Sequence, residues 1–485
     1  MMTSSRSAIM LLSLFFLAML PACGRIGDRL PALGSEAQFR HTPPQTETSA
    51  DLTLWWQAFA DPRLVQLLQR TARANAEVRI AVQRLRQARQ GVIAAEASLW
   101  PSLDLLASHT DARTSLPNFL KQGGMPDLQS KRLSLAAQWE LDLFGGQQAA
   151  RSAAEQEAAA AHYGIAGAQL LAISETARHY LHWHGLQERI NLLQAVITNQ
   201  EEERQRIRSQ HREGWLAEPE LARADAAYNE TAALLPALRT QQSMSEHRIA
   251  LLSGDDPSLP VPELQLAGVS PLQQIPVVNP GQPLELLQRR PDLLAAERQL
   301  AAASARWQEA RSQHLPKIFL SALFGRQALL INHSLQPGTS PFANVAATFS
   351  LPLLHAGAIE ANMAAHEARE QELWLEYEKK LHQAIEEVEN LLLALHEEQQ
   401  TASHHEASRQ ARWQASQRTT SLLRAGEIGL IPHLQAERAH LAALLKVNES
   451  QTQRALLTVQ LFTALGGGWQ TLPQPIPQPE QVSAP

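Results

Sequence analysis

The sequence predicts an α+β membrane protein in which bilayer-length strands lead into very long helices. Residues 133–143 (LSLAAQWELDL) and 343–353 (ANVAATFSLPL) alternate in side-chain character with a period of two, which is typical of a β-strand between an apolar and a polar phase. Each segment runs into a long alanine-rich helix, just after Gly145-Gly146 and Gly357. About eleven residues suffice for a tilted strand to cross a bilayer, so the strands are candidates for the membrane.

The chain is also an internal duplication. Matching segments recur at a nearly constant offset: residues 75–85 with 290–300 and Pro101 with Pro316 at 215, and Arg212-Glu-Gly214 with Arg424-Ala-Gly426 at 212. A repeat of this length is too long for a solenoid unit and implies two similar lobes. Each half is predicted to run helix, strand, loop, strand, long helix, tight turn, helix.

The long helices are predicted at residues 145–213 and 356–424, each roughly 100 Å long at about 1.5 Å per residue. Shorter helices at 62–99 and 217–254 together match that length, so they are expected to stack end to end along a long one. Apolar positions spaced by three and four predict coiled-coil seams. The seams are Trp183, Leu186, Ile190, Leu193 and Ile197; Leu381, Ile385, Val388, Leu392 and Leu395; and Leu64, Leu68, Thr71, Asn75, Val78, Val82 and Leu85.

The predicted strands cover residues 101–111, 131–143, 316–325 and 341–353, with outer loops at 112–130 and 326–340. Leu105-Leu106 breaks the phase of the first strand. Strands of a soluble sheet are the alternative interpretation. If the strands enter lipid, four of them cannot close a barrel, and an open edge leaves unpaired backbone groups that cost several kcal/mol each. Oligomerisation is then required.

The N-terminus predicts export. Arg6 precedes the apolar run 8–20, which suits the core of a signal peptide covering residues 1–22. Residues 20–23 (LPAC) resemble the lipobox of bacterial lipoproteins, which implies acylation of Cys23 after cleavage; Gly24 then favours the outer membrane. An incidental cysteine is the alternative. Cys23 is the only cysteine, so no disulfide can form within the chain.

Composition and proline content set the remaining boundaries. The net charge of −6 gives no basic surface for nucleic acid, and no apolar run after residue 20 approaches 18 residues. Any membrane crossing is therefore expected to use strands. The predicted organisation is a lipid-anchored tether at 23–61, a first repeat at 62–254 with its β-hairpin at 101–143, a linker at 255–283, a second repeat at 284–468 with its β-hairpin at 316–353, and a tail at 469–485.

Motifs for catalysis are absent from the sequence: it has no Walker loop, G-x-S-x-G elbow, H-E-x-x-H or C-x-x-C. His179, His182 and His184 lie on one predicted helix and His404-His405 on another. A metal site and a solvated or lumen-facing helix are the two interpretations, and spacing assigns no third ligand. We therefore expect no enzyme activity, no metal and no cofactor beyond the covalent lipid on Cys23.

Four segments resemble signature stretches of the TolC-type outer-membrane factors, in particular the lipoprotein branch typified by OprM and NodT. They are residues 55–62 (WWQAFADP), 139–146 (WELDLFGG), 287–300 (LQRRPDLLAAERQL) and 464–469 (ALGGGW). The resemblance implies a TolC-like homotrimer with a shared 12-stranded transmembrane β-barrel, four strands per subunit, and a long periplasmic α-helical barrel.

The same resemblance implies a function. It identifies the chain as the outer-membrane exit duct of a tripartite efflux pump in a Gram-negative bacterium, passively conducting drugs and toxic compounds. The implied partners are a periplasmic membrane-fusion adaptor, an inner-membrane efflux transporter and outer-membrane lipid. A TolC-like duct for type I protein secretion and a non-channel periplasmic coiled-coil lipoprotein remain alternatives, although a spacer needs no bilayer-length strands.

The helical turns are the candidate docking sites. Gly214 and Gly426 lie where two helices must reverse, and a left-handed glycine is a common solution there. The resemblance implies that these turns, with Arg212 and Arg424, form the periplasmic tip where the adaptor docks and the duct narrows. A plain hairpin turn, with arginines that complement helix dipoles, is the alternative.

The residues after the second turn are the candidate gate. Many relatives carry an acid in a Leu-Asp-Ala-Gln-like run, whereas residues 434–437 here are LQAE, so Gln435 replaces the carboxylate. Leu430 and Ile431 are instead predicted to form an apolar closure, which can gate by dewetting. Pro432 and His433 also depart from the pattern.

We predict that the mature protein begins at an acylated Cys23. Mass spectrometry of the N-terminal peptide should find lipid on that residue, and Cys23→Ser should block acylation and impair processing. An unmodified Cys23, or cleavage elsewhere, would contradict the prediction.

Overall fold

The computed structural model describes residues 38–41, 51–112, 128–331, 334–335 and 339–472. The predicted signal peptide, Cys23, and the tail from residue 473 lie outside the described residues. Within the described part, no helix is long and apolar enough to cross a membrane. In order, the elements are η1 (Leu52–Phe59), α2 (Pro62–Ala74), α3 (Ala76–Ala97), β1 (Ser102–Ala112), β2 (Leu128–Leu141), α5 (Gly146–Arg212), α6 (Glu218–Ala232), α7 (Leu234–Ser253), α8 (Pro262–Gln265), η2 (Pro271–Gln273), η3 (Pro283–Glu285), α9 (Leu286–Arg289), α10 (Pro291–Ser312), β3 (Lys317–Ile331), β4 (Ser334–Leu335), β5 (Ser340–Ser350), α11 (Ala358–Arg424) and α12 (Leu430–Ala464).

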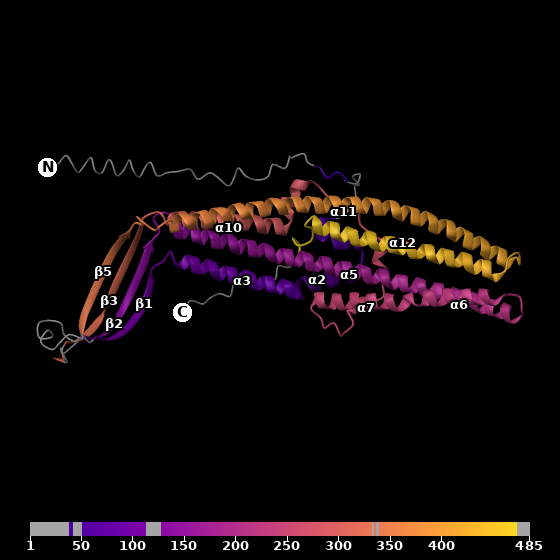
Figure 1. Cartoon of the computed structure of the whole chain (residues 1–485), viewed down its shortest axis with the longest axis horizontal. Coiled ribbons are helices and arrows are strands. Elements are labelled where there is room, and N and C mark those ends of the chain that lie inside the picture. Colours follow the sequence, from indigo (N-terminus) through magenta and orange to yellow (C-terminus); the bar gives the residue numbers. More distant parts are fainter. Residues whose placement is uncertain (1–37, 42–50, 113–127, 332–333, 336–338, 473–485) are drawn as a thin grey trace. The chain divides into compact units, whose positions relative to one another are not determined.

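The strands form one antiparallel sheet in the order β1-β2-β3-β5, with β4 paired to the end of β3 (Figure 1). In register, Leu105 lies opposite Leu135, Leu135 opposite Phe324, and Phe324 opposite Ala343. Because side chains alternate between faces, one face of the sheet is apolar across all four strands. Leu106 lies opposite Ser134 on the other face, which explains the phase break in β1.

The apolar face of the sheet is largely uncovered. Leu105 is 68% exposed, Val345 74% and Phe349 64%. Among the described residues the outer edges of β1 and β5 have no strand partner. Both the face and the edges therefore lack the contacts that a soluble sheet would supply within its own chain.

The strand predictions hold within three residues except at one end. The loop predicted at 326–340 is wrong, because β3 continues to Ile331 and β4 follows at Ser334–Leu335. Arg326 and Gln327 keep their backbone pairing with Leu133 and Arg132 of β2, so the strand extends into the segment predicted as a loop. Of the other predicted loop, residues 113–127 lie outside the described part of the chain.

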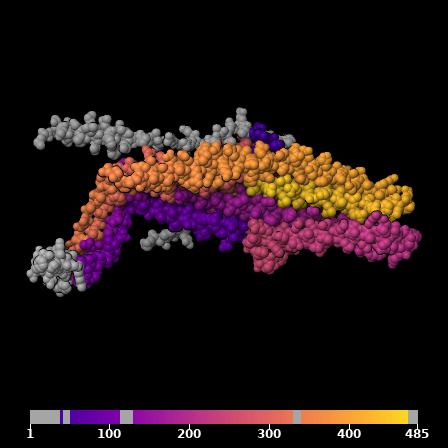
Figure 2. Space-filling view, in the orientation of Figure 1, coloured from indigo at the N-terminus to yellow at the C-terminus, as the bar shows by residue number. Residues whose placement is uncertain are grey.

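Two helices of 67 residues, α5 and α11, run from the strands to the turns, each roughly 100 Å long at about 1.5 Å per residue. Helices α2 and α3 and then α7 and α6 pack along α5 (Figure 1). Figure 2 shows α12 beside α11, and α12 also packs on α5. The predicted end-to-end stacking is confirmed.

Two helices predicted as single are each broken. The helix predicted at 62–99 ends at Ala74, because Asn75 is extended (ψ 133°) and caps α3 by accepting a hydrogen bond from the Glu77 N–H. At the matching position of the second repeat, the backbone of Arg290 is extended (ψ 116°), because the following Pro291 disfavours a helical conformation in the residue before it. The helix predicted at 217–254 divides at Ala233, where Pro236 lacks the N–H that would bond the preceding turn.

Most seam predictions hold. Every position of the seam from Leu64 to Leu85 is buried, as are Leu186, Ile190 and Leu193 of α5 and Leu381, Val388 and Leu392 of α11. Val196 and Ala384 are buried in place of the predicted Ile197 and Ile385, which are half-buried. The seam drifts by one residue because a straight α-helix does not keep a 3.5-residue period.

An aromatic core lies where the repeats meet, and it revises the predicted tether. Trp55 is fully buried, and its ring stacks on Phe462 of α12 at 5.3 Å between centroids. Gly468 (φ +109°) passes so close that an added Cβ would lie 2.8 Å from the Trp55 indole nitrogen. Residues 51–61 and 469–472 thus belong to the folded body rather than to a tether and tail, because burying these aromatic side chains outweighs the freedom of a linker.

A buried ion pair ties this core to the inter-repeat linker. Arg63 donates from Nη2 to Asp61 at 2.8 Å and also reaches the carbonyls of Leu266 (2.8 Å) and Val269 (2.9 Å). Tyr180 of α5 donates to the same carboxylate at 2.7 Å. Burial disfavours the Asp61 charge, yet the hydrogen bonds from Arg63 and Tyr180 lower its pKa overall. The linker predicted at 255–283 is accordingly ordered over α8 and η2.

His184, which is partly buried, is the member of the histidine group on α5 that packs against Tyr180. Its ring meets Tyr180 edge-on at 4.6 Å, and its Nε2 has no hydrogen-bond partner among the described residues. Burial, with the nearby Arg63 charge, lowers its pKa to about 4. Within the described residues, no three His, Cys, Asp or Glu side chains lie close enough to share a metal ion.

We predict a loss of stability between pH 6.5 and pH 4 that depends on His184. The unfolded histidine takes up a proton near pH 6.5, whereas the folded one stays neutral until about pH 4. The free energy of unfolding should therefore fall as the pH falls through this window, by about 2 kcal/mol at pH 5 from this residue. Asp61 stays ionised at pH 5 and does not contribute.

Thermal unfolding of the purified protein at pH 7.5 and pH 5 tests this. His184→Phe keeps a ring against Tyr180 and should reduce the acid-induced drop in the unfolding midpoint, while exposed His404→Gln should leave it unchanged. Lowered pKa values at His179 and His182, both caused mainly by burial, leave a smaller residual drop. The same pH response in both variants would contradict the assignment.

Candidate functional site: the helical turns and the polar cluster beside them

The two helical turns have the same backbone geometry. Gly214 (φ +78°) and Gly426 (φ +73°) are left-handed, and the next residue donates its N–H to the carbonyl five residues back, from Trp215 to Gln210 and from Glu427 to Leu422, at 2.9 Å in both. Both glycines are exposed with open space around them. The duplication therefore supplies two equivalent turns at the end of the helices away from the sheet (Figure 1).

The predicted docking arginines lie on these turns. Arg212 ends α5 and Arg424 ends α11, and both side chains are exposed. The residue that follows each glycine differs in chemistry. It is an aromatic Trp215, 73% exposed, in the first turn and an exposed acidic Glu427 in the second. The two turns thus share their backbone but offer different chemistry to a partner.

A polar cluster near the turns joins the helical hairpin α5–α6 to the helical hairpin α11–α12. We call Asn199, Glu203, Gln435, Glu437 and Arg438 the α5–α12 cluster. Glu203 is only 8% exposed; it pairs with Arg438 and accepts a hydrogen bond from the Gln435 amide at 3.3 Å. Asn199 donates to the Leu434 carbonyl at 3.1 Å and to the Glu437 carboxylate at 3.0 Å. Removing Arg438 would leave a nearly buried carboxylate unpaired, which is strongly destabilising for a buried pair.

Only part of this cluster follows from the sequence. Gln435 was singled out as the residue that replaces an acid, and the structure places its amide against α5. Asn199 and Glu203 are four apart and share one face of α5, which is a detectable signal. The sequence contains no indication that α12 faces them, so Glu203 and Arg438 escape a sequence-based search.

A second charged group holds α6 against α5. Arg204 lies over the Tyr228 ring at 4.3 Å and pairs with Glu201 at 2.6 Å, while Arg208 pairs with Asp225 at 3.2 Å. No residue of α6 is buried. Within the single chain, α6 is therefore held to α5 mainly by polar contacts.

The candidate gate residues begin α12. Leu430 is 36% exposed, Ile431 is half-buried, and the imidazole of His433 lies 3.4 Å from the Thr419 hydroxyl of α11. Leu430 and Ile431 therefore follow the Gly426 turn directly, and Gln435 lies one helical turn further along α12. The single chain brings one copy of each residue to the tip.

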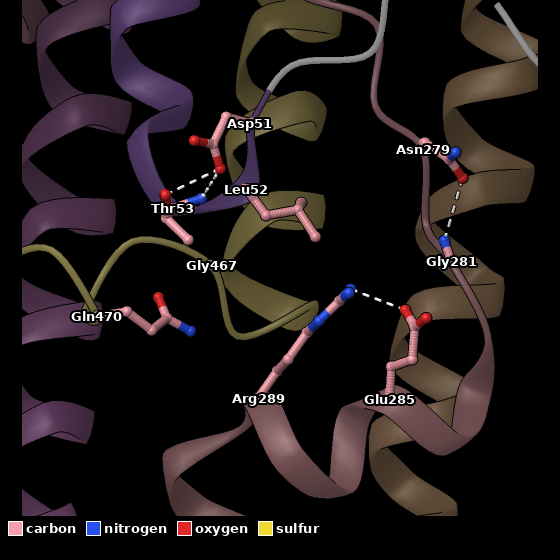
Figure 3. Close-up of a pocket in the computed structure, with 9 residues that line it drawn as sticks. All are labelled: Asp51, Leu52, Thr53, Asn279, Gly281, Glu285, Arg289, Gly467 and Gln470. Atoms are coloured by element: carbon pink, nitrogen blue, oxygen red, sulfur yellow. Dashed lines mark hydrogen bonds and ion pairs between the residues drawn. The ribbon is translucent and has the colours of Figure 1, made fainter.

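A polar pocket of about 380 Å³ lies where the start of the folded body, the linker and the C-terminal segment meet (Figure 3). Its charged side chains are largely paired with one another. Arg289 pairs with Glu285 at 2.9 Å, and the Thr53 N–H donates to Asp51 at 2.8 Å. The pocket marks the convergence of three segments far apart in sequence.

Comparison with known proteins places this geometry in a family. The model of the family described as outer membrane efflux protein matches residues 67–255 and 283–467. The chain belongs to that family. Its fold is TolC-like, and it acts as an efflux duct in the outer membrane of a Gram-negative bacterium. The two matched segments correspond to the two repeats of the efflux protein.

Individual relatives agree over nearly the whole length. The pyoverdine export outer membrane protein OpmQ of Pseudomonas aeruginosa is 29% identical over 93% of this chain and 95% of its own. The toluene efflux pump outer membrane protein TtgI of Pseudomonas putida is 28% identical over 94% and 98%. Among solved structures, the outer-membrane channel OprN matches with a TM-score of 0.79 at 28% identity, covering 90% of this chain and 97% of its own. The open state of the Neisseria gonorrhoeae MtrE channel matches with a TM-score of 0.79 at 25% identity, covering 95% and 100%.

We predict that Gly426→Ala will loosen the second turn while Gly429→Ala will not. Both glycines have open space for a Cβ, but Gly426 is left-handed and Gly429 has φ −81°. The left-handed alanine should cost about 1 kcal/mol, roughly a fivefold faster exchange of the Glu427 amide hydrogen. Hydrogen-exchange mass spectrometry of the turn peptide measures this. Equal protection in the two variants would show that the turn does not depend on the left-handed residue.

Proposed function

We propose that this efflux protein works as a homotrimer joined to a periplasmic adaptor and an inner-membrane transporter, and that it conducts small molecules outward. The observation that carries the proposal is the sheet, which combines one continuous apolar face with two unpaired edges. An apolar face suits lipid, and open edges in lipid must be covered by other strands. Three copies of four long strands close such a sheet into the predicted 12-stranded barrel.

The helices support the same assembly. Helix α6 buries no residue within the chain, and the exposed faces of α11 leave its packing incomplete. A closed three-fold arrangement would give both helices neighbours. The exposed turns, with Arg212, Trp215 and Arg424, are then free at the far end to meet the adaptor.

Small molecules are the favoured cargo. Pyoverdine and toluene, for which the relatives above are named, are both small molecules, so they support efflux over polypeptide secretion. A passive duct needs no catalytic group, and selection among cargoes then rests with the transporter. Acylation of Cys23 would hold each subunit to the outer membrane.

The tip is proposed to be closed at rest. Three copies of Leu430 and Ile431 would converge beside the Gly426 turns as an apolar constriction. The α5–α12 cluster holds α12 against α5. Opening therefore requires the helical hairpin α11–α12 to move away from the hairpin α5–α6, and the Glu203–Arg438 pair to separate. Engagement of the adaptor is the proposed source of that free energy.

We predict that Ile431→Asp will open the duct. A carboxylate in the constriction should admit water and ions, so single-channel conductance of the purified protein in planar bilayers should rise several-fold and cells should become sensitive to vancomycin. Gln435→Asp should change the closure less, shift selectivity toward cations and make conductance respond to divalent ions.

The control is Leu251→Asp, which alters an exposed leucine of α7 away from the turns. Electron microscopy of each preparation should show three-fold particles with a lumen, which establishes equal assembly. Equal conductance of assembled Ile431→Asp and parent would place the gate elsewhere. A folded monomer with a closed soluble sheet would refute the duct itself.

A further inference from the structure

The two most exposed large apolar side chains of the described part of the chain are neighbours. Leu353 is 86% exposed and Leu354 is 89% exposed, in the segment between β5 and α11. Scattered surface leucines need no explanation, but an adjacent pair at this exposure calls for a partner. The backbone holds them out, because Ala356 (φ +49°) and Gly357 (φ +82°) are both left-handed and turn the chain sharply into α11.

The first repeat carries the same feature. Between β2 and α5, Leu143 is 59% exposed and Phe144 is 43% exposed, and left-handed Gly145 follows them. The duplication has therefore placed an apolar pair ahead of a left-handed turn at both junctions of a strand with a long helix. Figure 1 shows both junctions at the same end of α5 and α11, where these helices meet the sheet.

The charged side chains beside the first junction have partners of their own, although Glu140, Asp142 and Lys317 line a polar pocket together with Leu143 and Phe144. Asp142 accepts a hydrogen bond from the Gln148 N–H at 2.8 Å, so its carboxylate is turned toward the start of α5. Glu140 and Lys317 pair at 2.9 Å on the polar face of the sheet. Residues 143–146 and 351–357 contain no Asp, Glu, Lys or Arg.

The apolar pairs also continue the apolar face of the sheet. Leu351 and Leu353 follow the end of β5 at Ser350 and continue, in sequence, the alternation of Val345, Ala347 and Phe349. Trp100, 69% exposed, lies just before β1 at the same junction level, and the Trp139 indole donates to the Leu99 carbonyl at 2.9 Å. Exposed aromatic rings beside an apolar face are typical of a membrane–water interface.

We propose that Leu143, Phe144, Leu353 and Leu354 form an apolar collar that inserts into the periplasmic leaflet of the outer membrane and sets how deep the sheet sits. The proposal rests on the membrane placement of the sheet proposed above. The partner is the phospholipid bilayer itself. In a three-fold assembly the two junctions of each subunit would surround the duct with six such pairs.

Site-directed fluorescence in vesicles tests the collar. Leu354→Cys and, as a second collar position, Leu143→Cys are labelled with an environment-sensitive fluorophore in the full-length trimer. The trimers are placed in phosphatidylethanolamine–phosphatidylglycerol vesicles that carry nitroxide either on the headgroup or near the end of an acyl chain. The parent trimer, treated in the same way, is the blank that measures any labelling of Cys23.

Both collar labels should be quenched several-fold more by the headgroup nitroxide than by the deep one. Phe349→Cys on the apolar face of β5 should be quenched by the acyl-chain nitroxide, and Ala217→Cys in the first turn by neither. Collar labels quenched by neither lipid, beside a quenched Phe349→Cys label, would overturn the collar and leave the duct standing. Covalent linking of Leu354→Cys between subunits by a short bismaleimide would also overturn the collar, because the side chain would then face another subunit and not lipid. An unquenched Phe349→Cys label would instead refute the membrane placement of the sheet.

Discussion

The hydrogen-bond register of the sheet is the constraint on which the rest of the structure depends. Side chains alternate faces at every residue, so a slip of one position in any pair of strands would move its apolar side chains to the opposite face. The register of β1, β2, β3 and β5 keeps Leu105, Leu135, Phe324 and Ala343 in one row. That row makes the sheet one-sided, and the unpaired edges of β1 and β5 make a single chain incomplete.

The two long helices extend from the sheet to the turns. Both 67-residue helices begin directly after a left-handed glycine that ends the short segment joining a strand to the helix. Along them the stabilising contacts change in kind. Near the middle, Trp55, Phe462 and the Asp61–Arg63–Tyr180 group form a dense core. Toward the turns the buried apolar side chains are fewer, with Leu434 and Ile207 among them, and ion pairs, a cation–π contact and amide hydrogen bonds join α5, α6 and α12.

This gradient has a consequence for motion. Apolar packing is lost only when side chains separate into water, but polar contacts at a half-exposed tip can exchange for water at a small net cost. The middle of the helices is therefore held more firmly than the tip. Glu203 is the exception at the tip, since its burial makes the pair with Arg438 costly to separate.

The sequence by itself determined the duplication, the long helices, the strand positions and the glycine turns, because each depends on periodicity or on a residue type with a local conformational preference. The breaks at Asn75 and Arg290 were hidden, since the apolar seam continues across Asn75 while the backbone does not. Only the tertiary structure decided that residues 51–61 join the core, that Gln435 faces Glu203, and that the apolar pairs at 143–144 and 353–354 lie at the same junction. Those facts depend on which surfaces meet across more than 200 residues of chain, and a local pattern of side chains contains no information about the surface that will face it.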